Sequence, residues 1–128
     1  MSTFPPDLKY THDHEWLRAN GANWRVGITQ FAVDQLGDIT LVDLPKEGDQ
    51  VTKGQRFGTI ESVKSVSDLY APISGRVVSV NASLKDSPED VNADPYNKGW
   101  MIELEANDKA EIDELMDQAA YTAHVAAQ

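Results

Sequence analysis

The 128-residue sequence contains no cysteine. This excludes disulfide frameworks, thiolate metal sites, iron–sulfur clusters and cysteine nucleophiles, so any sulfur redox chemistry must belong to a group that the chain carries. Positive charge is also scarce. The 11 Lys and Arg residues against 21 Asp and Glu residues give a net charge of −10, which disfavours nucleic acid as a partner. No apolar run approaches the roughly 18 residues of a membrane span, so no membrane association is expected.

The N-terminus lacks the features of a targeting segment. Residues 1–6 show neither a basic segment followed by an apolar stretch nor an Arg- and Ser-rich amphipathic pattern. We therefore expect a cytoplasmic bacterial protein, or a protein of the mitochondrial matrix only if a transit peptide has been removed. The length predicts a single domain over 1–128, with its core at about 8–106.

Short strand signals separated by turns dominate the chain. Trp24, Val26 and Ile28 alternate with Arg25 and Gly27, which predicts a half-buried strand. Similar signals predict strands at 39–44, near 51, and at 57–62, 76–80 and 100–104. Thr29 as an N-cap and Gly37 as a C-terminal stop predict a short internal helix. The pattern indicates a mostly β sandwich or barrel with helical additions.

A second helix signal appears only near the C-terminus. Ile112, Leu115, Met116 and Ala119 fall at i, i+3, i+4 and i+7, which is one face of a helix. Asp108 followed by Glu111 resembles a capping box. We therefore predict a C-terminal helix over about 108–124.

The most informative residue is Lys64, a lone lysine between two strand-like stretches. A hairpin lysine is ordinarily a solvated surface charge. Here Glu61 lies three residues before it and Asp68 four residues after it. A lysine that an enzyme acylates needs a rigid turn, nearby groups for the enzyme to recognise, and an amine that solvent can reach. The surroundings of Lys64 fit these requirements.

The stretch 61–75, ESVKSVSDLYAPISG, resembles the lipoyl attachment segment of the glycine cleavage H-protein family. The likeness extends in one register over roughly residues 8–121 and includes the stretches 9–16, 26–29, 35–39, 94–96 and 99–102. The resemblance implies a barrel-sandwich hybrid of two small antiparallel sheets, of the lipoyl/biotinyl carrier type. It also implies a first strand at 10–16 and places Lys64 at an exposed hairpin tip.

The resemblance further implies a function. Lipoate in amide linkage to Lys64 would carry an aminomethyl group from a pyridoxal-phosphate glycine decarboxylase (P protein) to a tetrahydrofolate-dependent aminomethyltransferase (T protein). A dihydrolipoyl dehydrogenase (L protein) would then reoxidise it. The chain would be a non-catalytic carrier and most simply a monomer. Glu61 and Ser62 would be recognised by the lipoylating enzyme.

The same resemblance implies a surface cleft for the loaded arm. Glu15 and Asp68 match acidic positions associated with that cleft, where a carboxylate can hydrogen-bond a charged nitrogen. Gln35 stands where some relatives carry histidine, so it can form a hydrogen bond there but cannot titrate.

Several alternatives are weaker. Biotinyl domains place methionine on both sides of the lysine, whereas Val63 and Ser65 flank Lys64. Lipoyl domains of 2-oxo acid dehydrogenases are shorter and lack the first strand and the C-terminal helix. A stand-alone enzyme lacks support, because no nucleophile–base pair or cofactor fingerprint is evident. Donation of lipoate to other complexes stays open.

A metal site also finds little support in the sequence. His12 and His14, two apart on the expected strand, would share a face. His124 in the terminal helix is expected to lie far from them. No metal is therefore predicted.

Overall fold

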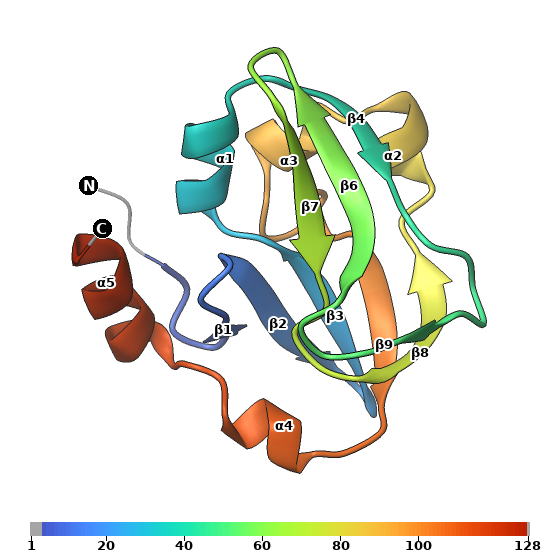
Figure 1. Cartoon of the computed structure of the whole chain (residues 1–128), viewed down its shortest axis with the longest axis vertical. Helices are drawn as coiled ribbons and strands as arrows, with labels where there is room; N and C mark the ends of the chain where they lie inside the picture. The colour runs from blue at the N-terminus through green and yellow to red at the C-terminus, as the bar shows by residue number, and fades with distance from the viewer. Residues whose placement is uncertain (1–3, 128) are drawn as a thin grey trace.

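Two antiparallel sheets form the framework of this computed structural model, which describes residues 4–127. The larger sheet has six strands in the order β1 (Lys9–Tyr10), β2 (Glu15–Asn20), β3 (Asn23–Ile28), β9 (Ile102–Ala106), β8 (Gly75–Val80) and β5 (Gln50–Val51). The smaller has the order β4 (Ile39–Asp43), β6 (Arg56–Ser62) and β7 (Val66–Tyr70). Figure 1 shows β6 and β7 as a long hairpin that projects from the body. The predicted fold class is confirmed.

The main hydrophobic core lies between the sheets and takes side chains from both. Val26 and Leu104 come from the larger sheet, and Ile60 and Leu69 come from the smaller one. All four are almost completely buried. Because successive strand residues point to opposite faces, their neighbours Glu61 and Asp68 lie on the outer face of the smaller sheet.

The predicted first strand at 10–16 is wrong in one respect. It consists of two strands, β1 and β2, joined by a tight turn at 11–14. His14 adopts φ +69° in this turn, a left-handed conformation that histidine tolerates better than most residues. The turn is closed by hydrogen bonds from Thr11 N–H to Glu15 O (3.0 Å) and from His14 N–H to Thr11 O (3.2 Å). It places Glu15 at the first position of β2.

The short internal helix forms as predicted, as α1 (Gln30–Leu36). The Thr29 side chain caps its N-terminus by accepting a hydrogen bond from Ala32 N–H. Gly37 ends it with φ +80°, where a side chain would be strained, and donates its N–H to Val33 O. The signals that define α1 are local, which explains why the sequence revealed them.

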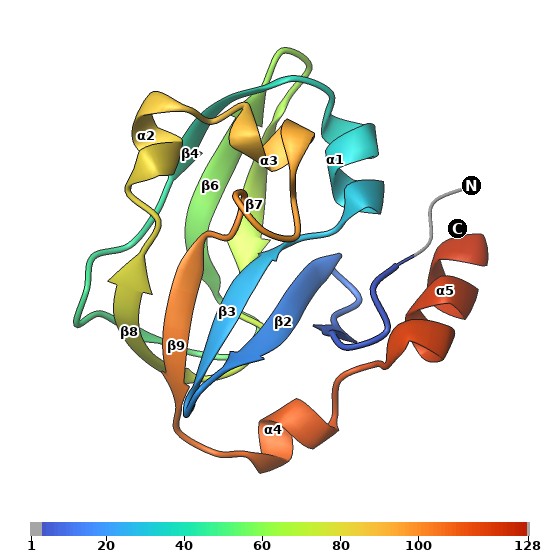
Figure 2. The ribbon, with the colours of Figure 1, turned by 180° about the vertical axis from the view of Figure 1, so that it is seen from behind.

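Two further short helices, α2 (Ser83–Asp86) and α3 (Asp90–Ala93), fill the connection between β8 and β9 and were not predicted. Figure 2 shows α3 beside α1. The Asn92 side chain links them: its Nδ2 donates to Gly37 O and its Oδ1 accepts from Ile39 N–H, both at 2.9 Å. Asn92 thereby fixes the chain between α1 and β4.

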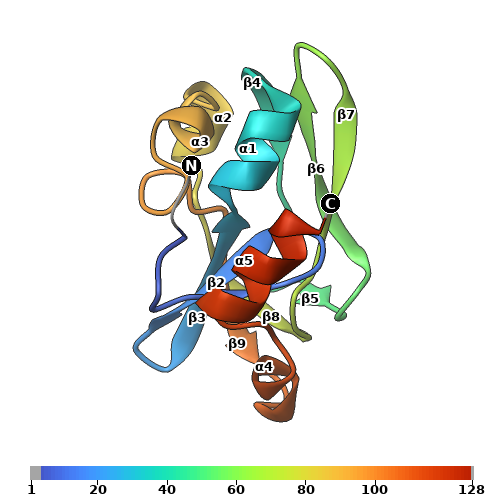
Figure 3. The same cartoon turned by 90° about the vertical axis from the view of Figure 1, so that its left-hand side faces the viewer.

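The predicted C-terminal helix is confirmed, but its bounds of about 108–124 are wrong because the segment is not one continuous helix. The segment forms two helices, α4 (Ala110–Asp113) and α5 (Gln118–Ala126), seen in Figure 3. Between them Met116 pairs with Tyr10 through two backbone hydrogen bonds of 2.8 and 2.9 Å. A residue whose amide and carbonyl bind a strand cannot continue a helix. Asp117 then caps α5 by accepting from Ala120 N–H at 2.9 Å.

The predicted capping box does not form either. Asp108 accepts a hydrogen bond from Ala110 N–H at 2.9 Å. The Glu111 carboxylate instead binds Ser74, accepting from its N–H at 2.8 Å and its hydroxyl at 3.2 Å. This contact fastens α4 to the start of β8. The tertiary partner therefore outcompetes the local one.

Candidate functional site

Lys64 lies at the tip of the β6–β7 hairpin, where its backbone is held by a serine. Ser62 N–H donates to Ser65 O at 2.8 Å and closes the turn. The Ser62 hydroxyl oxygen accepts from the N–H groups of Lys64 and Ser65, each at 3.2 Å. Ser62, which the family resemblance links to recognition by the lipoylating enzyme, thus also shapes the turn that presents the lysine. Lys64 itself is exposed.

The hairpin tip is tied to the end of α1. Val63 N–H donates to Asp38 O at 3.0 Å. The Lys64 side chain lies over Gly37, because a methyl group built on Gly37 would stand 3.4 Å from Lys64 Cε and 3.9 Å from Nζ. The lysine is therefore directed along the C-terminal end of α1 instead of straight into solvent.

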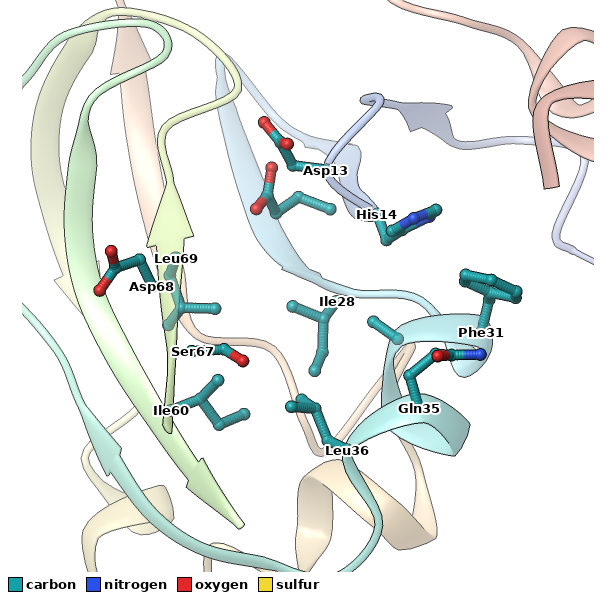
Figure 4. Close-up of a pocket in the computed structure, with 12 residues that line it drawn as sticks. Asp13, His14, Ile28, Phe31, Gln35, Leu36, Ile60, Ser67, Asp68 and Leu69 are labelled. Atoms are coloured by element: carbon teal, nitrogen blue, oxygen red, sulfur yellow. The ribbon is translucent and has the colours of Figure 1, made fainter. Parts of the chain in front are cut away.

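A cavity of about 480 Å³ lies between α1, β7 and the start of β2. Figure 4 shows side chains from these elements converging on it. Its apolar and polar lining comes from Asp13, His14, Glu15, Ile28, Phe31, Ala32, Gln35, Leu36, Ile60, Ser67, Asp68 and Leu69. Leu36 precedes Gly37, over which Lys64 lies, so Lys64 stands beside the end of the cavity that Leu36 lines.

Glu15 marks the opposite end. Its carboxylate accepts a hydrogen bond from the Thr11 hydroxyl at 2.8 Å and from Tyr70 N–H at 3.3 Å. Tyr70 is the last residue of β7, whereas Lys64 lies just before the first. Glu15 thus joins the β1–β2 turn to the smaller sheet. It was found by resemblance, and the structure places it on the cavity wall.

Glu15 is only 2% exposed, and that burial dominates its protonation. Desolvation raises the pKa of Glu15 to about 8, with a further contribution from the negative charge of Asp13. The hydrogen bonds from Thr11 and Tyr70 act in the opposite direction and do not compensate. Around neutral pH the carboxyl group is therefore largely protonated while no cation adjoins it.

The other two expected cleft residues lie differently. Gln35 is an α1 residue that lines the cavity. Asp68 borders the cavity, but Figure 4 shows its carboxylate directed away from the side on which Ser67 lies. That carboxylate instead lies 3.7 Å from Arg56 and 3.5 Å from the Tyr70 hydroxyl. Asp68 is thus a rim residue of the site.

Sequence reasoning missed three polar residues of the cavity: Ser67, Asp13 and His14. Ser67 shares the inner face of the smaller sheet with Ile60, its cross-strand partner. Its position two residues before the buried Leu69 could have revealed this. Asp13, in the turn before Glu15, lines the cavity as well. His14, from the same turn, also lines it.

The histidines do not lie as predicted. His12 and His14 belong to the β1–β2 turn and not to a strand, and His124 packs against both, with ring centroids 4.8 and 5.7 Å away. The expectation that His124 lies far away is therefore wrong. Within residues 4–127 no three His, Cys, Asp or Glu side chains are placed to hold a metal ion. Nor is any helix of that part of the chain long and apolar enough to cross a membrane.

Two small antiparallel sheets, with a lysine at a hairpin tip beside a cavity, form a fold of the lipoyl-carrier type. The comparisons with known proteins make this specific. Residues 8–128 match the family model of the glycine cleavage H-protein, and the chain belongs to that family.

Individual relatives agree over almost the whole chain. The glycine cleavage system H protein of Myxococcus xanthus is 55% identical over 93% of this chain and 92% of its own length. That of an Anaeromyxobacter strain is 54% identical over 97% of both. The crystal structure of the H protein from Mycobacterium marinum superposes with a TM-score of 0.88 at 40% identity, covering 96% of this chain and 99% of the other.

Proposed function

We propose that Lys64 carries a lipoyl group in amide linkage and that the chain shuttles an aminomethyl group between the enzymes of the glycine cleavage system. Family membership supports the carrier role. The observation that carries the assignment is the position of the Lys64 side chain, over Gly37 and beside a cavity that has a buried carboxyl group at its other end. When bound, the lipoyl group supplies a disulfide whose reduction accompanies uptake of the aminomethyl group.

The residues of the cavity suit such an arm along its length. Ile28, Leu36, Ile60 and Leu69 provide apolar surface for a hydrocarbon chain. Ser67 and Gln35 provide hydrogen-bonding groups beside it. Glu15 provides a carboxyl group for a cationic nitrogen at the far end. In this arrangement the amine cargo would lie beside an acid, and Lys64 at the other end of the cavity would stay exposed.

Glu15 would also exchange a proton as the cleft fills. Burial keeps its carboxyl group protonated near neutral pH, and the pKa is about 8. A neighbouring ammonium group favours the carboxylate, so occupation of the cleft by a cationic cargo would release the proton from Glu15. Closure of the arm should therefore become more favourable as the pH rises toward 8.

The decarboxylase (P protein), the aminomethyltransferase (T protein) and the dihydrolipoyl dehydrogenase (L protein) are the proposed partners, together with a lipoylating enzyme. The chain would provide no catalysis of its own. The net charge of −10 favours brief, electrostatically steered encounters with such partners. A monomeric state and a cytoplasmic location in a bacterium also stay predictions; the relatives described above are bacterial proteins.

Intact-mass analysis of the native protein tests the assignment. We expect a mass increase of one lipoyl group that is absent in Lys64→Ala. A wild-type protein that stays unmodified, even when incubated with a lipoylating enzyme, ATP and lipoate, would overturn the proposal.

A second experiment tests the cleft. Glu15→Ala should shorten the lifetime of the carried aminomethyl group against hydrolysis, because the buried acid is lost and water gains access. Asp68→Asn is the matched control and should have a smaller effect, since the Asp68 carboxylate points away from the cavity. Equal lifetimes in wild type and Glu15→Ala would contradict the role of Glu15.

A further inference from the structure

Large apolar side chains are exposed at one place on the surface. Among residues 4–127 three such side chains stand out: Leu41 (48% exposed), Val63 (67%) and Val66 (64%). Val63 and Val66 flank the Lys64 turn, and Leu41 lies on the neighbouring strand β4. We call these three residues the tip patch. Exposed apolar side chains that gather beside a functional residue mark an interaction site more often than chance placement does.

The strand register places most of the tip patch in one row. Leu41 lies opposite Glu61, and Glu61 lies opposite Val66, across the three strands of the smaller sheet. Directly paired residues share a face of the sheet, so this row consists of an apolar, an acidic and an apolar side chain: Leu41, Glu61 and Val66. The adjoining inner row, Val42, Ile60 and Ser67, faces the core and the cavity. Leu41 and Val66 therefore belong to the outer face, and Val63 lies in the turn beside them.

Within the described residues 4–127, no helix covers this face near the tip. Figure 3 shows α1, α2 and α3 all on one side of the β6–β7 hairpin, and the outer face on the other side. Two residues further from the tip, a second row of side chains lies on the same outer face. In this row Thr59 of β6 pairs with Asp43 of β4 on one side and with Asp68 of β7 on the other. Both of these acidic residues are exposed. The face thus combines an apolar patch with an acidic border, in which Arg56 offsets the charge of Asp68 but no ion pair is formed by Asp43 within residues 4–127.

The atom at which each partner enzyme reacts decides which of them this face suits. An enzyme that acylates Lys64 reacts at Nζ itself, so its active site has to enclose residues adjacent to the lysine. Enzymes that act on the distal end of a long arm can work with the tip at a distance. Of these enzymes, the acylating enzyme is therefore the one that has to contact the residues one or two positions from Lys64.

We propose that the tip patch, together with Glu61, is the docking surface for the enzyme that acylates Lys64, and that this enzyme presents an apolar surface bordered by basic side chains. The inference rests on the proposed acylation of Lys64. Burial of Leu41 and Val66 would supply affinity, because buried apolar anchors dominate interface energies. The acidic border would steer the encounter, so the KM for the carrier should rise with ionic strength.

Acylation kinetics on the full-length, unmodified chain test the proposal. A lipoate–protein ligase with ATP and lipoate is the probe, and the initial rate is followed by intact mass at increasing carrier concentration. Val66→Thr and Leu41→Thr should each raise the KM for the carrier about fivefold with little change in kcat, and the double variant should raise it more. Val66→Ile and Leu41→Met keep the apolar surface and should behave like wild type.

Two controls separate docking from other causes. Acetylation of Lys64 by a small reactive ester, measured on its own peptide, should proceed at the wild-type rate in every variant, which shows that the lysine and its turn are intact. Asp43→Asn should weaken the salt dependence of the KM, whereas Glu105→Gln, an exposed carboxylate on β9 of the other sheet, should not.

The outcomes are distinguishable. Wild-type protein that is never acylated contradicts the proposed function itself. Normal acylation with an unchanged KM in the double variant overturns the docking surface alone. So does a rise in KM confined to the glycine decarboxylase, or a wild-type dimer that Val66→Thr dissociates, since each assigns the tip patch to another occupant.

Discussion

Replacing Glu15 with glutamine reveals how much the protonation of this one buried group contributes to the pH dependence of the unfolding free energy. The folded state holds the Glu15 pKa at about 8, against the ordinary value of 4.5 that we assign to the unfolded chain. Between these values the folded protein binds one proton more than the unfolded protein does. The free energy of unfolding contributed by Glu15 is therefore fully present below pH 4.5 and is lost as the pH rises through 8. Glutamine does not titrate and contributes no such slope.

The magnitude follows from the linkage relation. Each pH unit between the two pKa values removes about 1.4 kcal/mol, so the full range corresponds to about 5 kcal/mol as an upper limit. Between pH 5 and pH 7.5 we expect wild type to lose roughly 3 kcal/mol relative to Glu15→Gln. The lost or altered hydrogen bonds to Thr11 and Tyr70 add a constant offset and do not change the slope.

Urea unfolding followed by tryptophan fluorescence at a series of pH values measures this difference. The chain has three tryptophans as probes. Subtracting the two proteins at each pH cancels the titration of the other groups. A difference in unfolding free energy that stays constant from pH 5 to pH 7.5 would refute the reasoning, because Glu15 would then have the same pKa in both states.

Three further predictions concern the parts that surround the site, and all are measured by chemical denaturation. Tyr121→Phe removes a buried hydroxyl that lies 2.7 Å from the Thr29 hydroxyl and 2.8 Å from His14 Nδ1. It should lower the unfolding free energy by about 1–3 kcal/mol, and an unchanged value would show that these two hydrogen bonds contribute nothing. Gly27→Ala places a methyl group 2.5 Å from the Trp16 ring and should cost about 1–3 kcal/mol. Combining it with Trp16→Phe should cost less than the two single losses together, and strict additivity would contradict the clash. Asp117→Ala removes the N-cap of α5 and should cost about 1 kcal/mol, and no loss would mean that packing alone holds α5.

Features set by local chemistry were predictable from the sequence. The bounds of α1 follow from Thr29, which caps the helix, and from Gly37, which takes the left-handed conformation that ends it. The position of Lys64 on a hairpin follows from the strand patterns on either side. In each case the decisive residues lie within a few positions of the feature, so no knowledge of the rest of the fold was needed.

Features set by distant contacts were not predictable. The apolar spacing in the C-terminal segment favours one helix, yet Met116 pairs with Tyr10, more than a hundred residues earlier in the chain. Glu111 leaves its expected capping position for Ser74 in another element. The two competing partners, a strand backbone and a turn serine, are identifiable only once the chain has folded. Tertiary hydrogen bonds here override a helix preference worth only tenths of a kcal/mol per residue.

The resemblance implies that Asp68 belongs to the cleft, but side chains alternate between the two faces of a strand, and this alternation directs Asp68 away from the cavity. Leu69 is buried, so the residues two apart from it share its face and Asp68 points to the opposite one. Ser67 accordingly faces the cavity while the Asp68 carboxylate lies beside Arg56 on the outer face. A charged nitrogen inside the cavity can therefore reach the Glu15 carboxylate without leaving it, but would have to come to the rim to reach Asp68. If the cleft protects its cargo by burial, the protective acid is Glu15, and the difference between Glu15→Ala and Asp68→Asn in cargo lifetime measures how far that holds.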